Sequence, residues 1–378
     1  MIGPMDDQKH LCRHWDIFCR VIDNFGDAGV CWRLAADLAN RGERVRLFID
    51  QPEILQQLIR NNSTGQLVEI CAWPENQFPF KAQDVADVVI EAFACDIPDG
   101  YLHAMNFASK LVAWINLEYL SAESWVDDHH GLPSPHPRFA LTKHFYFPGF
   151  TTRTGGLLRE PALSASLQAA ATIEAKGLTE ALKIFLFSYE QPDIAQWLDA
   201  LNTGSRKTAL SLAPCPARPQ IDEWLLSQSH HKNLHVESLA FVPQHDFDAL
   251  LSQFDVLFVR GEDSFVRAQW AGKPLIWHIY PQEEDSHLLK LEAFYDRYLG
   301  TGVLSAMERS IVWRFVLAWN TGHTLPASET LAELWPQFVA ILPALHENAV
   351  LWRQQLLQQP DLVTQLRDFV GHLVKCKV

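Results

Sequence analysis

The sequence of 378 residues lacks long apolar segments, and none approaches the roughly 18 consecutive apolar residues of a membrane-spanning helix. Its N-terminus carries several charges, and no apolar run there is long enough for a signal peptide. The first ten or so residues have the composition of a frayed leader. These absences argue against both a membrane protein and a secreted one.

Positive charge is also scarce. The chain has 31 Lys and Arg residues against 45 Asp and Glu residues, a formal net charge of -14. A nucleic-acid partner is therefore not expected, because proteins that bind nucleic acids carry a basic patch or stripe. A basic protein partner is compatible with this charge, since an acidic surface attracts it.

Signatures of metal and nucleotide sites are missing as well. The seven cysteines form no C-x-x-C pair, and most lie beside apolar runs, as buried thiols do, which favours a reducing cytoplasm. There is no G-x-G-x-x-G, G-x-x-x-x-G-K-[ST] or H-E-x-x-H motif. The pairs His129–His130 and His230–His231 have no third ligand at a suitable spacing, and the D-x-D spelling at Asp246–Asp248 is interpreted as the start of a helix. We therefore expect no metal and no cofactor.

What the chain does contain is a regular alternation of short apolar runs and amphipathic stretches, including a predicted helix over 30–42. This rhythm is typical of parallel, doubly wound α/β sheets. A segment rich in Gly, Pro and Thr at 147–161 interrupts it, and a second series follows, with a helical segment from Leu331 onward. The pattern predicts two domains, 11–160 and 180–350. Ligands of such sheets bind outside the carboxyl ends of the strands, so a cleft between the domains is expected.

Two carboxylates and two glycines follow the first predicted strand in the stretch Ile22–Val30, IDNFGDAGV. One interpretation is that Asp23 and Asp27 cap a helix that begins near Val30, because Asp is a preferred capping residue. The other is that both acids act on a substrate, while the glycines allow a backbone to approach closely. This stretch alone leaves both open.

The turn Arg260–Ser264, RGEDS, lies between a buried apolar strand and a helix. Free N–H groups at a helix N-terminus are suited to binding a diphosphate, and the planar guanidinium of Arg260 can donate paired hydrogen bonds to a phosphate. Glu262 can accept hydrogen bonds from sugar hydroxyls. The alternative is that Asp263 or Ser264 only caps the helix and Arg260 is a surface pairing residue.

Together the stretches VIDNFGDAGVCWRLA and VRGEDSFVRAQWAGKPLIWHIYPQEEDSH resemble the signatures of the EarP family, bacterial protein-arginine rhamnosyltransferases that modify elongation factor P. The resemblance covers essentially the whole chain apart from the leader. It implies a GT-B fold of two Rossmann-like domains. The N-terminal domain would dock the acceptor and the C-terminal domain would hold the nucleotide sugar. A C-terminal helix at about 355–378 would cross back to the first domain.

The same resemblance implies the reaction. An inverting, metal-independent glycosyltransferase would move L-rhamnose from dTDP-β-L-rhamnose to one arginine in the N-terminal domain of elongation factor P. The modified factor would then rescue ribosomes stalled at polyproline. The donor is a substrate, so this implies no cofactor.

Residue roles are also implied by the match. Asp23, Asp27 and Glu262 correspond to the catalytic carboxylates of the family. Substrate contacts are implied for Asn24, Phe25, Gly26, Phe187, Tyr189, Gln244, Phe247, Arg260, Gly261, Asp263, Ser264 and Tyr280.

The chemistry of an arginine acceptor explains why the site would need these acids. The arginine guanidinium has a pKa above about 12 and no free lone pair, so it is a poor nucleophile. A carboxylate can align one nitrogen and take its proton as the C–N bond forms. We expect Asp27 to be the general base and Asp23 its orienting partner, with the reverse assignment open.

Two functions of other classes compete with this hypothesis. One is a non-catalytic dTDP-sugar-binding regulator of elongation factor P. The other is an NAD-dependent oxidoreductase, against which the missing G-x-G-x-x-G speaks.

Overall fold

The structure is a computed structural model. It describes residues 12–23, 25–60, 67–74, 80–163, 165, 181–228, 230, 232–282, 285–322 and 329–375. The expected leader and Asn24 therefore lie outside the described residues, as do His231 and the last three residues of the predicted C-terminal helix.

The N-terminal half is built on a sheet of seven strands in the order β3-β2-β1-β4-β5-β7-β6. Neighbouring strands are parallel except β6, which is antiparallel to β7. The strands are β1 (His14–Cys19), β2 (Arg44–Ile49), β3 (Val68–Ala72), β4 (Val88–Ala92), β5 (Ala113–Leu117), β6 (Pro133–Pro135) and β7 (Thr142–Tyr146). The helices are α1 (Phe25–Asn40), α2 (Pro52–Leu58), α3 (Asp99–Asn106) and α4 (Val126–His129), with the 3₁₀ turn η2 (Ala82–Asp84).

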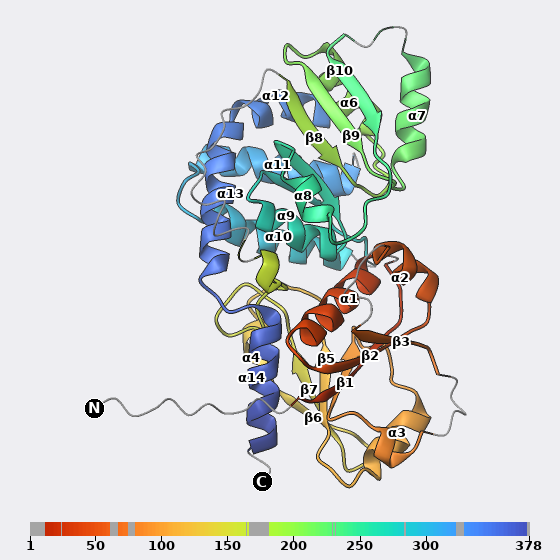
Figure 1. The fold of residues 1–378 in the computed structure, drawn as a ribbon. Helices are drawn as coiled ribbons and strands as arrows, with labels where there is room; N and C mark the ends of the chain where they lie inside the picture. The colour runs from red at the N-terminus through yellow and green to blue at the C-terminus, as the bar shows by residue number, and fades with distance from the viewer. Residues whose placement is uncertain are drawn as a thin grey trace.

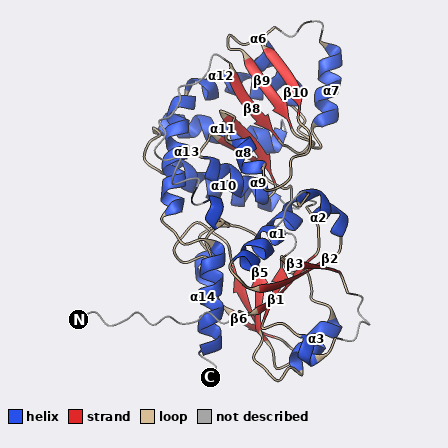
Figure 2. Cartoon of the chain, viewed as in Figure 1, coloured by secondary structure: helices blue, strands red, loops and turns tan. Residues whose placement is uncertain are grey.

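The C-terminal half contains a second, fully parallel sheet in the order β10-β9-β8-β11-β12. Its strands are β8 (Leu182–Leu186), β9 (Thr208–Leu212), β10 (Leu234–Ser238), β11 (Val256–Arg260) and β12 (Leu275–His278). Its helices are α6 (Ile194–Thr203), α7 (Arg218–Ser227), α8 (Phe247–Leu251), α9 (Asp263–Ala271), α10 (Ser286–Leu299), α11 (Ala306–Thr321), α12 (Leu331–Ala340) and α13 (Leu342–Leu357). Figure 2 shows helices packed around both sheets.

The central strands explain why the sheets are parallel and covered. Every residue of β4, VVIEA, and of β11, VLFVR, is buried. Near-continuous apolar runs of this kind are typical of strands that have helices on both faces. The predicted α/β alternation is therefore confirmed in both halves.

The two halves are also joined away from the sheets. Helix α13 runs along the C-terminal half, and α14 (Leu362–Lys375) continues beside the N-terminal sheet (Figure 1). Leu362, Val363, Leu366 and Val370 of α14 belong to the same hydrophobic core as β1, β4 and β5. In the part of the chain that the structure describes, no helix has the length and hydropathy needed to cross a membrane.

The strand orders place one crevice in each half. In the N-terminal sheet the order reverses between β1 and β4, and in the C-terminal sheet between β8 and β11. Ligands of open α/β sheets bind at such switch points, outside the carboxyl ends of the strands. The IDNFGDAGV stretch follows β1 and the RGEDS turn spans the end of β11, so both predicted motifs lie at these points.

Candidate functional site

A cleft of about 530 Å³, part of it open to solvent, lies where the two motifs meet. Ten of the predicted site residues line it: Asp23, Phe25, Gly26, Phe187, Gln244, Phe247, Arg260, Gly261, Asp263 and Ser264. Leu58, Phe241 and Val242, which the sequence did not single out, complete the lining. Residues of both motifs therefore line one cavity, whereas the predicted site residues Asp27, Tyr189, Glu262 and Tyr280 are not part of its lining.

Asp27 lies in the first turn of α1 and is 2% exposed. Its Oδ2 accepts the backbone N–H groups of Ile22 and Asp23, at 2.8 and 2.9 Å. Burial raises the pKa of Asp27, and these two N–H groups together with the nearby Tyr119 hydroxyl oppose the rise. The turn thus holds a buried carboxylate that is more basic than an exposed one.

Helix α1 begins at Phe25, five residues before the predicted start near Val30. The glycines of the motif are poor helix formers and hid the first turn in the sequence. Asp27 is therefore a residue of the helix itself, which corrects the interpretation that it caps a helix starting at Val30.

Asp23 reaches across to the other half of the molecule. Its Oδ2 accepts the Tyr189 hydroxyl at 2.9 Å. A Cβ on Gly261 would lie 2.6 Å from the same oxygen, and Gly261 has φ +62°, so this close approach requires glycine. Burial raises the pKa of Asp23, while the Tyr189 hydrogen bond and the Arg260 charge lower it.

Glu262 completes a group of three carboxylates. Its Oε2 accepts the backbone N–H of Leu120, which follows β5, at 2.9 Å. Burial raises the pKa of Glu262 to about 8, the Leu120 hydrogen bond opposes this rise, and the nearby charge of Asp27 adds to it. The charge of Asp27 raises the pKa of both Asp23 and Glu262, whereas a cation placed among the three acids would favour their ionised forms.

Arg260, at the end of β11, has its guanidinium over two aromatic rings. The guanidinium carbon lies 4.9 Å from the Phe187 ring centroid and 4.5 Å from that of Tyr189, and the residue is 8% exposed. Such stacking immobilises the fork and leaves its edge N–H groups free to bind an anion. Tyr280 packs edge-on against Tyr189 at 5.7 Å.

The helix start after this turn differs from the prediction. The N-cap of α9 is Glu262, and it makes no side-chain capping hydrogen bond. The Ser264 hydroxyl instead donates to the carbonyl of Arg260, and Asp263 points to the other half. The interpretation that Asp263 or Ser264 caps this helix is therefore wrong, because Glu262 is the N-cap and both side chains are bonded elsewhere.

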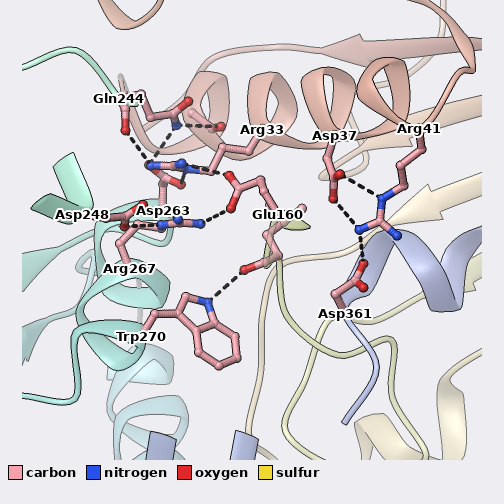
Figure 3. A network of polar contacts seen from close by, with 12 residues as sticks. Arg33, Asp37, Arg41, Glu160, Gln244, Asp248, Asp263, Arg267, Trp270 and Asp361 are labelled. Carbon is pink, nitrogen blue, oxygen red and sulfur yellow. Dashed lines mark hydrogen bonds and ion pairs between the residues drawn. The ribbon is translucent and has the colours of Figure 1, made fainter. Parts of the chain in front are cut away.

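Asp263 and Gln244 belong to a network between the halves, shown in Figure 3. Asp263 Oδ1 accepts Arg33 Nε at 2.6 Å, and Asp263 Oδ2 accepts Gln244 Nε2 at 2.9 Å. Gln244 Nε2 also donates to the carbonyl of Gly29 at 3.0 Å. A Cβ on Gly29 would lie 3.0 Å from that nitrogen, so the space beside this glycine is taken by the other half of the molecule.

Glu160, from the segment between the two sheets, joins two buried arginines (Figure 3). Its carboxylate pairs with Arg33 Nη1 at 3.0 Å and with Arg267 Nη1 at 2.6 Å. Arg267 is also bonded to Asp248, Nε to Oδ1 at 2.7 Å. Asp248 of α8 therefore forms an ion pair with Arg267 of α9. The helix predicted to begin at the D-x-D sequence Asp246–Asp248 is confirmed.

Several of these residues were missed from the sequence, among them Arg33, Tyr119, Glu160 and Arg267. One signal was present: Arg33 and Arg267 are charged residues on otherwise apolar helix faces, as in VCWRLA and FVRAQWA. A charge at such a position requires a buried partner. Their shared partner Glu160 lies more than 100 positions away from each of them along the chain, and nothing in the sequence identifies it.

Metal ligands do not gather among the described residues: no group of three His, Cys, Asp or Glu side chains there has an arrangement that could hold a metal ion.

Comparison with known proteins agrees with this geometry. The model of the family described as elongation factor P (EF-P) rhamnosyltransferase EarP matches residues 15–371. A protein-arginine rhamnosyltransferase of Pseudomonas putida is 41% identical, covering 94% of this chain and 98% of its own. The enzyme of the same name from Pseudomonas aeruginosa is 39% identical, with the same coverage.

Solved structures show the same fold. A structure that describes EarP-mediated arginine glycosylation of translation elongation factor EF-P has a TM-score of 0.61 at 28% identity, over 97% of this chain and 100% of that one. MurG of Acinetobacter baumannii shares the fold alone, with a TM-score of 0.53 at 13% identity, over 95% of this chain and 99% of that one. The predicted GT-B fold of two facing Rossmann-like halves is confirmed. The chain belongs to the EarP family of elongation factor P rhamnosyltransferases and is a glycosyltransferase.

Proposed function

We propose that this chain moves L-rhamnose from dTDP-β-L-rhamnose to an arginine side chain of elongation factor P, with inversion at the anomeric carbon. The observation that carries the proposal is the meeting of three carboxylates from both halves, the buried Asp27 and the partly exposed Asp23 and Glu262, beside an immobilised arginine. An acidic pocket suits a guanidinium, and a fixed cation suits a diphosphate.

The acceptor side follows from charge. A guanidinium that enters between Asp23, Asp27 and Glu262 would relieve their mutual repulsion, and each carboxylate can accept its N–H groups. Asp27 is the proposed general base, because burial raises its pKa while two backbone N–H groups fix its orientation. Asp23, held by Tyr189, is the proposed orienting partner.

The donor side follows from the C-terminal motif. The stacked guanidinium of Arg260 and the N–H groups at the start of α9 face the same cleft. Both would stabilise the negative charge that develops on the leaving dTDP. Phe187 and Phe247 offer apolar surface beside them. We propose that no divalent metal takes part in the reaction.

The proposed step is a single displacement. The arginine nitrogen attacks the anomeric carbon, the bond from this carbon to the diphosphate oxygen breaks, and the proton of the attacking nitrogen passes to Asp27. The base lies in the N-terminal half and the cation for the leaving group in the C-terminal half, on two sides of the cleft. This arrangement supports inversion and an α-rhamnosyl product.

The proposed acceptor is the N-terminal domain of elongation factor P in the cytoplasm, and the modification would prepare that factor to relieve ribosomes stalled at polyproline. Incubation with purified elongation factor P and dTDP-β-L-rhamnose, followed by intact-mass spectrometry, tests the proposal. The expected result is a gain of one deoxyhexose that disappears when the acceptor arginine is replaced by lysine. Binding of both substrates without any gain would instead indicate a non-catalytic dTDP-sugar-binding regulator.

A further inference from the structure

A carboxylate lies beside the place proposed for the diphosphate of the sugar donor. Asp263 is the first residue of α9, directly after the N-cap Glu262, and it lines the cleft. The N–H groups at the start of this helix favour an anion, but a free carboxylate beside them would repel a diphosphate. A donor site here therefore needs a cation that cancels the charge of Asp263.

Arg33 of the N-terminal half supplies the opposite charge. Its Nε donates to Asp263 Oδ1 at 2.6 Å, and the two side chains are 5% and 13% exposed. Among the residues that the structure describes, no other cation forms an ion pair with Asp263. The cation that lines the cleft, Arg260, is instead stacked over Phe187 and Tyr189.

The reach of Arg33 across the interface follows from the packing of the two helices. A Cβ on Gly29 would lie 3.3 Å from both Cβ and Cγ of Asp263, so α1 and α9 approach each other closely at this glycine. Arg33 lies four residues further along α1, one turn on and on the same face as Gly29. This spacing brings the Arg33 side chain to the first turn of α9.

The guanidinium of Arg33 is also fixed by two other groups (Figure 3). Its Nη1 pairs with Glu160 at 3.0 Å, and its Nη2 donates to the backbone carbonyl of Gln244 at 3.2 Å. The side chain of Gln244 in turn donates to Oδ2 of Asp263 at 2.9 Å. Both oxygens of Asp263 therefore have partners in the protein, and the carboxylate is held in one orientation.

We propose that Arg33 is a positioning residue for the sugar donor: it holds and neutralises Asp263, so that the diphosphate can bind at the start of α9. The inference rests on the proposed function, because it takes the diphosphate of the donor as the occupant of this site. It gives a buried residue of the N-terminal half, which acts through Asp263, a part in donor binding.

Binding of dTDP and of thymidine to the full chain, measured by isothermal titration calorimetry, tests the inference. In Arg33→Gln the carboxylate of Asp263 stays and its counterion is lost. We expect dTDP to bind about 10- to 100-fold more weakly than to wild type, because charges a few ångströms apart repel each other with an energy of that size. Thymidine, which lacks the diphosphate, should bind within about twofold of its wild-type affinity. An equal loss for both ligands overturns the inference.

Substitutions of Asp263 separate the charge from the interface contact. Asp263→Asn in the Arg33→Gln background removes the repelling carboxylate and keeps the size of the side chain, so it should recover most of the lost dTDP affinity. A purely structural role of Arg33 predicts no recovery, and dTDP affinity as low as in Arg33→Gln overturns the inference. Asp263→Asn alone should bind dTDP more tightly than wild type, and equal or weaker binding overturns the inference even if Arg33→Gln does not fold.

Arg41→Gln is the matched control on the same helix. Arg41 bonds to Asp37 at 2.8 Å and to Asp361 at 2.7 Å, and none of these three residues lines the cleft (Figure 3). Its dTDP affinity should stay within about twofold of wild type, and a loss equal to that of Arg33→Gln overturns the inference. A wild type that binds no dTDP counts against the proposed function, whereas equal dTDP binding by wild type and Arg33→Gln overturns this inference alone.

Discussion

Replacement of Glu160 by glutamine is the sharpest test of how the two halves are held together. Glu160→Gln keeps the shape of the side chain and removes its charge. The carboxylate lies between Arg33 and Arg267, whose side chains are 5% and 1% exposed. Both arginines keep one acidic partner after the change, Asp263 and Asp248 respectively, so the network is weakened and not abolished.

The size of the effect follows from the electrostatics. Although burial opposes it, the charges of Arg267 and Arg33 lower the pKa of Glu160 from 4.5 to about 2. A difference of this size between the folded and unfolded states corresponds to about 3 kcal/mol of stability at pH 7. Removing one partner of a buried ion pair costs about 3–5 kcal/mol in other proteins, which agrees with this figure.

Thermal unfolding followed by tryptophan fluorescence measures the change. A loss of about 3 kcal/mol lowers the midpoint by about 6–12 °C for folded units of this size. The control is Asp222→Asn, which breaks an ion pair at the surface. The side chains of this pair, Asp222 and Arg218, are 46% and 42% exposed. It should change stability by less than about 1 kcal/mol.

The pH dependence has a defined sign. Because the pKa of Glu160 is lowered by folding, its contribution is fully present above the unfolded value of about 4.5 and is lost as the pH falls toward 2. The difference between wild type and Glu160→Gln should therefore be full at pH 7 and shrink below pH 4. A melting midpoint for Glu160→Gln within 1 °C of the surface control at pH 7 would refute the reasoning.

Three further predictions concern the cleft. Burial raises the pKa of Glu262 to about 8, so wild type loses stability as the pH rises from about 4.5 through 8 and this side chain ionises. Thermal melts should therefore show that Glu262→Gln, which stays neutral, gains stability relative to wild type by pH 9. Melting midpoints that change with pH in the same way for both proteins would contradict this. Arg260→Lys replaces a stacked fork by a point charge and should raise the donor KM about 10- to 100-fold, whereas an unchanged KM would remove Arg260 from the donor site. Transfer in the presence of EDTA should proceed at the normal rate, and restoration of a lost rate by added Mg²⁺ or Mn²⁺ would show that the reaction needs a metal.

The order of strands and helices could be predicted well from the sequence. Runs such as DVVIEAF and FDVLFVRG become β4 and β11, which are buried on every residue. Such apolar runs carry their signal locally, because a strand covered on both faces must be apolar throughout. The positions of both motifs at strand ends follow from the same pattern.

Helix boundaries at the site were predicted less well. Two glycines obscured the start of α1, where Gln244 of the other half donates to the carbonyl of Gly29. At α9 the expected side-chain cap is absent, because Asp263 is bonded to Arg33 and Ser264 to the carbonyl of Arg260. Local propensity cannot report partners that the fold brings from elsewhere.

The geometry of the site itself lay beyond sequence reasoning. Asp23 and Asp27 were recognised as a pair, but Asp23 bonds to Tyr189 and lies against Gly261, while Asp27 accepts the N–H groups of Ile22 and Asp23. The contacts of Asp23 join residues that are far apart in the chain. Spacing within a motif reports which residues are neighbours and cannot report which direction a side chain takes.

The most direct test of the account is the rate at which Asp27→Asn transfers deoxyhexose to elongation factor P at saturating donor and acceptor. If Asp27 takes the proton of the attacking nitrogen, the variant should lose about 10²–10⁴-fold in kcat, with unaltered melting and unaltered donor binding. Transfer by Asp27→Asn at the wild-type rate would contradict the central claim that this carboxylate is the base.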